Sequence, residues 1–417
     1  MNANDSDVLV LGGGVIGLAC ALELLRAGRG VTVLEQGRAG GATSHGNCGT
    51  LTPSHATPLA MPGMVGQALR QMLQSDAPFR VKPRFDPALW AWMLRFARLC
   101  NWRDFERINR LKAPLLMRSR QGIEALVRAE GLDCEFEALG TLYAFRDAAA
   151  FERAQWLPRA LRQVGVPVEV LDGAATRARE PALNDSIVGA FYNTADAHLR
   201  PDRYVAELAR RVRERGGRIV EREAVLALEA GSGRIESVAT GTARHRARDY
   251  VLALGAWSPL LSRTLDLRLP IQPGKGYSIT FERPARCPRI PVVCKERSVC
   301  VTAWSSGYRL GSTMEFAGYD SSLNRTRLDA LVRGAGEYLH EPVGPRREEE
   351  WYGWRPMTYD DLPIIGRAPR HANLVLATGH GMLGVTMSAV TAELVTDLIC
   401  GRAPALDPAP FGLQRFA

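Results

Sequence analysis

Hydrophobic residues at the start of the chain are arranged as a strand, a turn, a helix and a second strand. Residues 7–11 form a short apolar run, and residues 15–25 repeat apolar positions with helical spacing. A second apolar run at 31–34 ends at Glu35. This order predicts a βαβ unit with parallel strands, the common framework of nucleotide-binding domains.

The turn between the first strand and the helix carries Gly12, Gly14 and Gly17 in the spacing G-x-G-x-x-G. Gly12 permits the tight turn, Gly14 lets the backbone approach a pyrophosphate, and Gly17 lets the helix pack on the strand. The helix N-terminus offers free N–H groups and a positive dipole end to phosphates. Glu35 is placed to accept hydrogen bonds from ribose hydroxyls. Together these features predict a dinucleotide site, whereas the glycines alone would be a weak signal.

The hydrophobic pattern predicts further elements along the rest of the chain. Helices are predicted at residues 65–74, 87–99, 112–130, 204–215 and 386–399. Strands are predicted at 139–145, 218–220, 224–230, 237–240, 250–254 and 374–377, with short strands between 271 and 311. The stretch 53–62 is rich in Pro and Ala and predicts no regular structure. Helix 87–99, with Trp90 and Trp92, is expected to pack on its own domain, with a membrane-surface helix as the alternative.

Two strands far from the N-terminus also run into glycine turns, at Gly255 and Gly379. The second turn is followed by a helix that ends at Gly401. Both ends of the chain therefore contribute to one sheet, as in flavoproteins that hold a long dinucleotide across two domains. The predicted fold class is α/β, a discontinuous Rossmann-like FAD-binding domain with a second α+β substrate domain on an antiparallel or mixed sheet. The FAD-binding domain is assigned residues 1–85, 196–264 and 351–417, and the substrate domain 86–195 and 265–350.

Composition and charge narrow the function classes. The chain has 417 residues, of which 46% are hydrophobic and 23% charged, so a sizeable core is expected. The net charge is +9, but the basic residues are mostly arginines without clustering. A nucleic-acid partner is therefore not expected, while weak attraction to anionic membrane surfaces stays open. The polar N-terminus is not a signal peptide, and no segment qualifies as a spanning helix.

The eight cysteines contain no Cys-x-x-Cys pair, and the histidines and acids show no metal-ligand spacing. No metal is predicted, and free thiols indicate a reducing compartment. The expected location is the cytoplasm, with peripheral contact at the inner face of the cytoplasmic membrane as an option. No Gly-x-Ser-x-Gly elbow occurs, so nucleophilic catalysis is not expected.

The whole chain resembles the D-amino-acid oxidase superfamily of flavoproteins, and most closely its D-amino-acid dehydrogenases of the small-subunit type. The most specific matches are GWRPMT at 353–358, P-x-x-G-R at 363–367 and T-G-H-G-x-L-G at 378–384. Further matches are found at 10–17, 44–49, 58–63 and 275–278. The resemblance implies non-covalently bound FAD and oxidation of the Cα–N bond of an amino acid.

The resemblance implies a cofactor site and a substrate site. The positions expected to contact FAD are Gly12, Gly14, Val15, Ile16, Gly17, Glu35, Gln36, Thr43, Ser44, Asn47, Cys48, Gly49, Val225, Gly255, Trp257, Gly381, Met382, Leu383, Gly384 and Thr386. The last helix is expected to begin after Gly381 and to stabilise the reduced flavin's negative charge through its N-terminal N–H groups.

Arg355 is expected to bind the substrate carboxylate, because a guanidinium donates two parallel hydrogen bonds to it. The alternative is a structural Arg355 paired with Asp360 or Asp361. Tyr277 is expected as a second carboxylate donor or a wall of the pocket. Lys275 and His380 are further substrate-binding candidates, with surface or turn roles as the alternatives.

Three residues depart from the usual pattern of the dehydrogenases: Cys48, Leu362 and Val385. They lie in or near segments expected to face flavin or substrate, so they bear on which substrate is used. His45 raises the alternative of a covalent flavin link, which the sequence disfavours because the motif differs by one position.

The preferred hypothesis is an FAD-dependent D-amino-acid dehydrogenase that forms an imino acid and passes electrons to a quinone or respiratory acceptor. A cyclic substrate such as D-proline or cis-4-hydroxy-D-proline is one form of it. The alternatives are an electron-relay subunit, a glycine- or sarcosine-oxidase-like amine oxidase, and an NAD-linked dehydrogenase.

Overall fold

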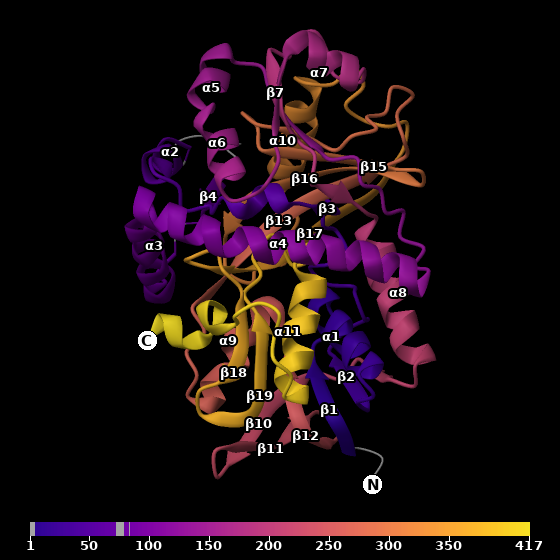
Figure 1. Ribbon diagram of the computed structural model, residues 1–417, viewed down its shortest axis with the longest axis vertical. Helices are drawn as coiled ribbons and strands as arrows, with labels where there is room; N and C mark the ends of the chain where they lie inside the picture. Colours follow the sequence, from indigo (N-terminus) through magenta and orange to yellow (C-terminus); the bar gives the residue numbers. More distant parts are fainter. Residues whose placement is uncertain (1–4, 72–78, 83) are drawn as a thin grey trace.

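A computed structural model describes residues 5–71, 79–82 and 84–417, and these residues are built around two large sheets. Figure 1 shows the first sheet in the lower half of the view and the second in the upper half, with the long helix α4 crossing between them. The two-sheet architecture agrees with the predicted α/β fold and its second domain.

The first sheet has eight strands and contains the predicted βαβ unit. The strand order is β10-β11-β12-β1-β2-β9, and β19 pairs with both β12 and β18. Strands β19, β12, β1, β2 and β9 are parallel, as the apolar runs predict. Its strands are β1 (Asp5–Leu11), β2 (Val31–Glu35), β9 (Arg218–Glu221), β10 (Val225–Gly231), β11 (Arg234–Thr240), β12 (Arg244–Leu252), β18 (Ile364–Ala368) and β19 (His371–Thr378). Because β1 and β19 share one sheet, both ends of the chain build it.

Three helices from distant parts of the chain pack together beside the first sheet. Helix α1 (Val15–Arg26) packs against α8 (Pro201–Glu214) and against α11 (Ser388–Cys400). Their apolar faces belong to one hydrophobic core, in which Leu18, Leu208 and Leu394 are fully buried or nearly so. The left-handed Gly401 ends α11 with a φ of 67°, as predicted.

The second sheet has nine strands and is mostly antiparallel. Its order is β17-β13-β16-β15-β14-β5-β7-β6, and β4 pairs with β16. The strands are β4 (Phe79–Val81), β5 (Thr141–Phe145), β6 (Glu169–Asp172), β7 (Gly189–Asn193), β13 (Ile271–Phe281), β14 (Val292–Cys294), β15 (Val299–Trp304), β16 (Gly307–Phe316) and β17 (Arg347–Thr358). The prediction of short strands between 271 and 311 is confirmed for β14 and β15, whereas β13 and β16 are long strands paired along most of their length.

The remaining helices cover the second sheet, join the two halves or, in the case of α9, pack against β10 of the first sheet. They are α2 (Met64–Gln71), α3 (Pro87–Leu99), α4 (Trp102–Glu130), α5 (Ala148–Arg153), α6 (Trp156–Gln163), α7 (Gly173–Arg179), α9 (Ser258–Ser262) and α10 (Arg325–Gly336). Helix α4 packs against α11, so it connects the two halves. It begins ten residues before the predicted start at 112 and continues through Pro114. Residues 72–78, which include the end of the helix predicted at 65–74, lie outside the described residues.

Local details also differ from the predictions. A short 3-10 helix occupies Pro53–Ala56 within the stretch expected to be irregular. Helix α3 packs inward through Leu89 and Trp92, as favoured, and Trp92 Nε1 donates to Met357 O at 3.2 Å. Strand β17 belongs to the second sheet, so the expected domain boundary at residue 351 falls inside one of its strands.

Candidate active site

A cavity of about 1420 Å³ lies where the two sheets face each other. It exceeds the 300–1,000 Å³ that is usual for a drug-sized ligand, so a dinucleotide and a small substrate have room together. The predicted cofactor positions that line it are Gly12, Gly14, Val15, Ile16, Glu35, Gln36, Thr43, Ser44, Asn47, Cys48, Val225, Gly255, Trp257, Gly381, Met382, Leu383 and Gly384. The cavity therefore joins segments from the start, middle and end of the chain.

The glycine turn has the close packing that its sequence predicts. Gly12 has a φ of +106°, and a Cβ there would lie 2.6 Å from Ala253 O. A Cβ on Gly17 would lie 1.9 Å from Gly12 O, so any side chain would push α1 away from β1. Gly17 does not line the cavity and acts through packing, while Gly14 faces the cavity with only Ser44 Oγ near its Cβ position, at 3.6 Å.

Glu35 lies at the end of β2 with its carboxylate already engaged by the backbone. Its Oε2 accepts from Gly13 N at 2.7 Å and its Oε1 from Gly37 N at 2.8 Å. An ionised carboxylate has about four lone-pair sites, so two remain for ribose hydroxyls. At the start of α1, Val15 N donates to Ser44 Oγ at 3.0 Å. The groups around this turn fit an adenosine and pyrophosphate.

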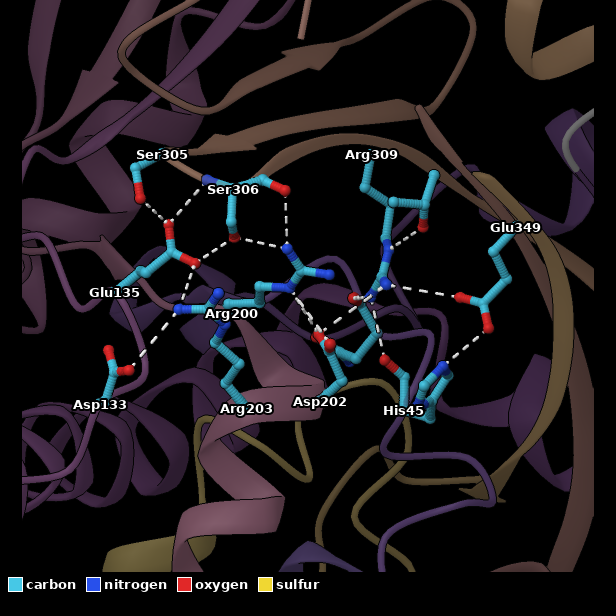
Figure 2. Close-up of polar contacts among 12 residues, drawn as sticks. His45, Asp133, Glu135, Arg200, Asp202, Arg203, Ser305, Ser306, Arg309 and Glu349 are labelled. Carbon is cyan, nitrogen blue, oxygen red and sulfur yellow. Dashed lines mark hydrogen bonds and ion pairs between the residues drawn. The ribbon is translucent and has the colours of Figure 1, made fainter. Parts of the chain in front are cut away.

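The loop that carries Ser44, Asn47 and Cys48 is fixed by an arginine that the sequence analysis missed. Arg309, buried on β16, donates from Nη1 to the carbonyl oxygens of His45 and Asn47 at 2.9 and 2.8 Å (Figure 2). Nothing in the local sequence distinguishes Arg309 from the other arginines, because the loop carbonyls that it binds are more than 250 residues away. The loop is therefore held from the second sheet.

His45 does not face the cofactor side of this loop. Its Nε2 lies 2.8 Å from Glu349 Oε1 on β17, and Figure 2 shows the two side chains directed toward each other. His45 is not among the cavity-lining residues of the described chain. This geometry agrees with the prediction that FAD is not attached through His45.

Gly49 and Thr386 were expected to contact FAD but lie behind the cavity wall. Gly49 has a φ of +76°, and a Cβ there would lie 2.0 Å from Leu199 O, so this glycine serves chain packing. Thr386 Oγ1 donates to Thr50 O at 3.3 Å and accepts from Thr52 N at the same distance. Thr386 therefore connects the segment before α11 to the N-terminal loop.

The predicted helix N-terminus at Gly381 is also corrected. Residues 382–387 form turns, and α11 begins only at Ser388. Leu383 N already donates to His380 O at 2.9 Å, so its N–H is not free for a ligand. The cavity is still lined at this turn by Gly381, Met382 and Gly384. Backbone groups of the turn therefore form the polar part of the cavity wall at this place.

Arg355 lies in the cavity without a carboxylate partner among the described residues. Its Nη1 donates to the carbonyl oxygen of Thr313. The alternative acids are engaged elsewhere: Asp360 pairs with Arg415 at 2.7 Å and Asp361 with Lys112 at 2.6 Å. The pairing of Arg355 with Asp360 or Asp361 that the structural alternative named is therefore wrong.

The guanidinium of Arg355 lies over Gly276 of β13. A Cβ at Gly276 would lie 2.4 Å from Arg355 Cζ, so the glycine makes space for the guanidinium. Burial lowers the pKa of Arg355 from its ordinary value, yet an arginine stays protonated in proteins. The site therefore holds a partly desolvated cation without a carboxylate partner among the described residues.

Two of the other substrate candidates are directed away from Arg355. Tyr277 borders the cavity, but its hydroxyl donates to Glu315 Oε2 at 2.7 Å, so it acts as a wall and not as a free donor. Lys275 Nζ donates to Ser322 O and does not line the cavity. The prediction that Lys275 binds substrate is therefore wrong, and the residue has a structural role.

His380 lines the cavity, and its ring is hydrogen-bonded to a residue of α11. Its Nε2 lies 2.9 Å from Thr391 Oγ1, and burial lowers its pKa to about 3. The imidazole is therefore neutral in the folded protein at ordinary pH.

A buried polar chain that the sequence analysis missed reaches another part of the cavity. Ser54 Oγ lies 2.6 Å from Asp196 Oδ2 and 3.0 Å from Tyr143 Oη, and Tyr143 Oη lies 3.1 Å from His55 Nδ1. His55 and Tyr143 line the cavity, whereas Asp196 is fully buried. Burial raises the pKa of Asp196 to about 7 and lowers that of His55 to about 3. No local motif could have revealed this chain, since its members come from three distant segments.

Apolar side chains cover the cavity beside Arg355. Met314 Sδ lies 3.9 Å from Arg355 Nη1, and Met314 packs in one cluster with Trp92, Phe316 and Met357. All four of these apolar residues line the cavity. A ligand carboxylate on Arg355 would therefore place its side chain among methionines and aromatic rings.

Of the three departures noted in the sequence, two face the cavity. Cys48 and Val385 line it, whereas Leu362 is fully buried in the core. Within the described residues there is no group of three or more potential metal ligands, and no helix there is long and apolar enough to cross a membrane.

Comparisons with known proteins match nearly the full chain. The family model described as FAD dependent oxidoreductase matches residues 7–398. A D-amino acid dehydrogenase of Chromohalobacter salexigens is 36% identical over 98% of this chain and 99% of its own. A D-amino acid dehydrogenase of Agrobacterium fabrum is 34% identical over 99% of this chain and 100% of its own.

Solved structures share the fold at lower sequence identity. Glycine oxidase from Geobacillus kaustophilus superposes with a TM-score of 0.80 at 24% identity, covering 99% of both chains. L-proline dehydrogenase from P. horikoshii superposes with a TM-score of 0.75 at 20% identity, covering 99% of this chain and 98% of its own. At these identities the comparison supports the fold alone.

Proposed function

Because the chain belongs to the FAD-dependent oxidoreductase family, we propose that it oxidises the Cα–N bond of a D-amino acid to the imino acid. Relatives that match nearly the whole chain carry the name D-amino acid dehydrogenase. The family fixes the cofactor and the class of reaction, and the residues of the cavity support the substrate.

One observation carries the proposal: Arg355 is a cation in a dinucleotide-sized cavity with no carboxylate partner among the described residues. A buried charge without a partner is costly, so such a group indicates a ligand of opposite charge. A guanidinium pairs with a carboxylate through two parallel hydrogen bonds, which fix its orientation as well as its position. An amino acid supplies that carboxylate.

FAD, when bound, supplies the hydride acceptor of the reaction. The chain binds and orients the substrate around it. Arg355 holds the carboxylate, the carbonyl of Thr313 keeps the guanidinium in place, and the missing side chain of Gly276 leaves space for it. Neutral His380 adds no competing positive charge to the same cavity.

The walls near Arg355 favour an apolar substrate side chain. Met314, Phe316 and Trp92 offer no charged partner for an acidic or basic side chain. A cyclic substrate such as D-proline or cis-4-hydroxy-D-proline is included in this class, because its ring is compact and largely apolar.

Anaerobic bleaching of bound flavin by paired D- and L-amino acids tests the proposal. We expect several apolar D-enantiomers, and none of their L-partners, to bleach the flavin. D-proline and cis-4-hydroxy-D-proline are separate members of the panel. A panel in which no D-amino acid bleaches the flavin would contradict the assignment and favour an electron-relay subunit. Bleaching by glycine or sarcosine alone would instead favour the amine-oxidase alternative.

The electron acceptor is part of the same proposal: a quinone or respiratory acceptor at the cytoplasmic face of a membrane. Exposed apolar side chains on and just before helix α3 support contact with a membrane. The side chains of Phe85, Trp90 and Leu94 are 96%, 53% and 55% exposed. Exposed apolar side chains next to arginines are suited to a membrane surface. Flotation with anionic vesicles, with and without a soluble quinone, tests this part separately from substrate oxidation.

A further inference from the structure

We propose that Cys48 and Cys300 form an oxidisable dithiol in the cavity, which hydroperoxides convert to an intramolecular disulfide. The inference goes beyond the proposed oxidation of amino acids and does not depend on its substrate. It rests on how the sheet register places the two sulfur atoms.

The register of the second sheet brings the two cysteines together. Cys300 on β15 pairs across the sheet with Gly311 on β16. Directly opposite residues of antiparallel strands have Cβ atoms about 4.5–5.5 Å apart. A Cβ on Gly311 would lie only 2.5 Å from Cys48 Sγ, so this sulfur occupies the place of the missing Gly311 side chain. The Cys48 thiol therefore sits beside Cys300, on the face of the sheet that carries the Cys300 side chain.

The two thiols differ from the other cysteines of the chain because both line the cavity. All eight cysteines are free thiols. Among the cavity-lining residues that the structure describes, the only cysteines are Cys48 and Cys300. Both are half-buried, while Cys20, Cys134 and Cys294 are buried in the cores. A small oxidant entering the cavity thus meets this pair.

The surroundings assign different roles to the two sulfur atoms. The neighbouring Cys300 thiol, together with the nearby cations Arg355 and Arg309, holds the pKa of Cys48 below its ordinary value. The same contact raises the pKa of Cys300 well above its ordinary value. Because the thiolate is the nucleophile, Cys48 is the attacking cysteine and Cys300 the resolving one.

The chemistry balances with a hydroperoxide as the oxidant. The Cys48 thiolate attacks the distal oxygen, the O–O bond breaks, and the alcohol leaves after taking a proton, which gives a sulfenic acid. The Cys300 sulfur, after losing its proton, attacks the Cys48 sulfur and displaces hydroxide, which leaves as water. Two thiols and one hydroperoxide thus give one disulfide, one alcohol and one water.

Peptide mass spectrometry of the oxidised holoprotein tests the proposal. The reduced, desalted protein is treated with one to two equivalents of tert-butyl hydroperoxide, denatured, and alkylated with iodoacetamide. We expect two of the eight thiols to be lost to alkylation and the peptides of Cys48 and Cys300 to be found linked. Cys300→Ser should lose the link and leave a Cys48 sulfenic acid that dimedone traps.

A matched control uses a half-buried cysteine outside the cavity. Cys287→Ser should keep the Cys48–Cys300 link, because residue 287 does not line the cavity. The proposal is overturned if a tenfold excess of hydroperoxide leaves both thiols alkylatable, or if the linked peptides contain other cysteines. Neither readout depends on turnover, so a failed amino-acid panel would not decide this experiment.

Discussion

Replacing Arg355 with methionine should strongly reduce amino-acid oxidation without destabilising the protein. Methionine keeps an unbranched chain of similar length but removes the cation. Removing one partner of a buried, hydrogen-bonded charge pair costs about 2–5 kcal/mol. At 1.36 kcal/mol per factor of ten, kcat/KM should fall by roughly 30- to 5,000-fold.

Although the activity of Arg355→Met should fall, its thermal stability should not. In the free protein the guanidinium has lost water and has gained only the carbonyl of Thr313 and a weak contact with Met314. The variant removes this desolvation cost, so the melting temperature should stay the same or rise. A residue whose role was structural would lower it.

Arg309→Met is the matched control, since Arg309 is also buried but carries the loop of His45 and Asn47. It should lower the melting temperature and weaken flavin retention. The assay is dye-linked oxidation of an apolar D-amino acid together with thermal unfolding of both variants. An Arg355→Met protein with kcat/KM within threefold of wild type would refute the role of Arg355 in carboxylate binding.

Three further predictions concern stability, cofactor retention and substrate binding. The folded pKa of Asp196, about 7, lies above its ordinary value of 3.8, so the folded state holds the proton more tightly between these pH values. Relative to Asp196→Asn, the wild-type free energy of unfolding should therefore fall by about 4 kcal/mol as pH rises from 4 to 8, measured by urea denaturation. Gly17→Ala should lose bound flavin, measured by absorbance, because its Cβ would meet Gly12 O at 1.9 Å. Gly276→Ala should keep flavin but raise KM severalfold in the dye-linked assay, because its Cβ displaces the Arg355 guanidinium.

Another glycine of this chain provides a control for the two alanine variants. Gly241 has nothing within 4 Å of the position that a Cβ would take, has no positive φ and does not line the cavity. Gly241→Ala should leave flavin content and KM unchanged. For Asp196, the free energy of unfolding is the quantity to compare. If it changes equally with pH in wild type and Asp196→Asn, Asp196 does not have the raised pKa.

Features that depend on neighbouring residues could be predicted from the sequence alone. The strand, glycine turn and helix from β1 to α1 follow from local spacing, and Gly12 and Gly17 have the packing expected of them. Arg355 was found because its motif is contiguous. The sequence could not show whether Arg355 is paired with a nearby acid. Only the structure shows that Asp360 and Asp361 pair with other cations.

Features that depend on sheet register and on contacts between distant segments required the folded structure. Three such features join residues that are far apart in the chain. They are the long pairing of β13 with β16, the hydrogen bonds from Arg309 to the 45–47 loop, and the polar chain that ends at Asp196. The Cys48–Cys300 contact exists because Gly311, opposite Cys300, leaves a gap for a side chain from another loop. Local spacing has no information about such partners, because a shift of one residue in strand pairing would turn Cys300 to the opposite face of the sheet.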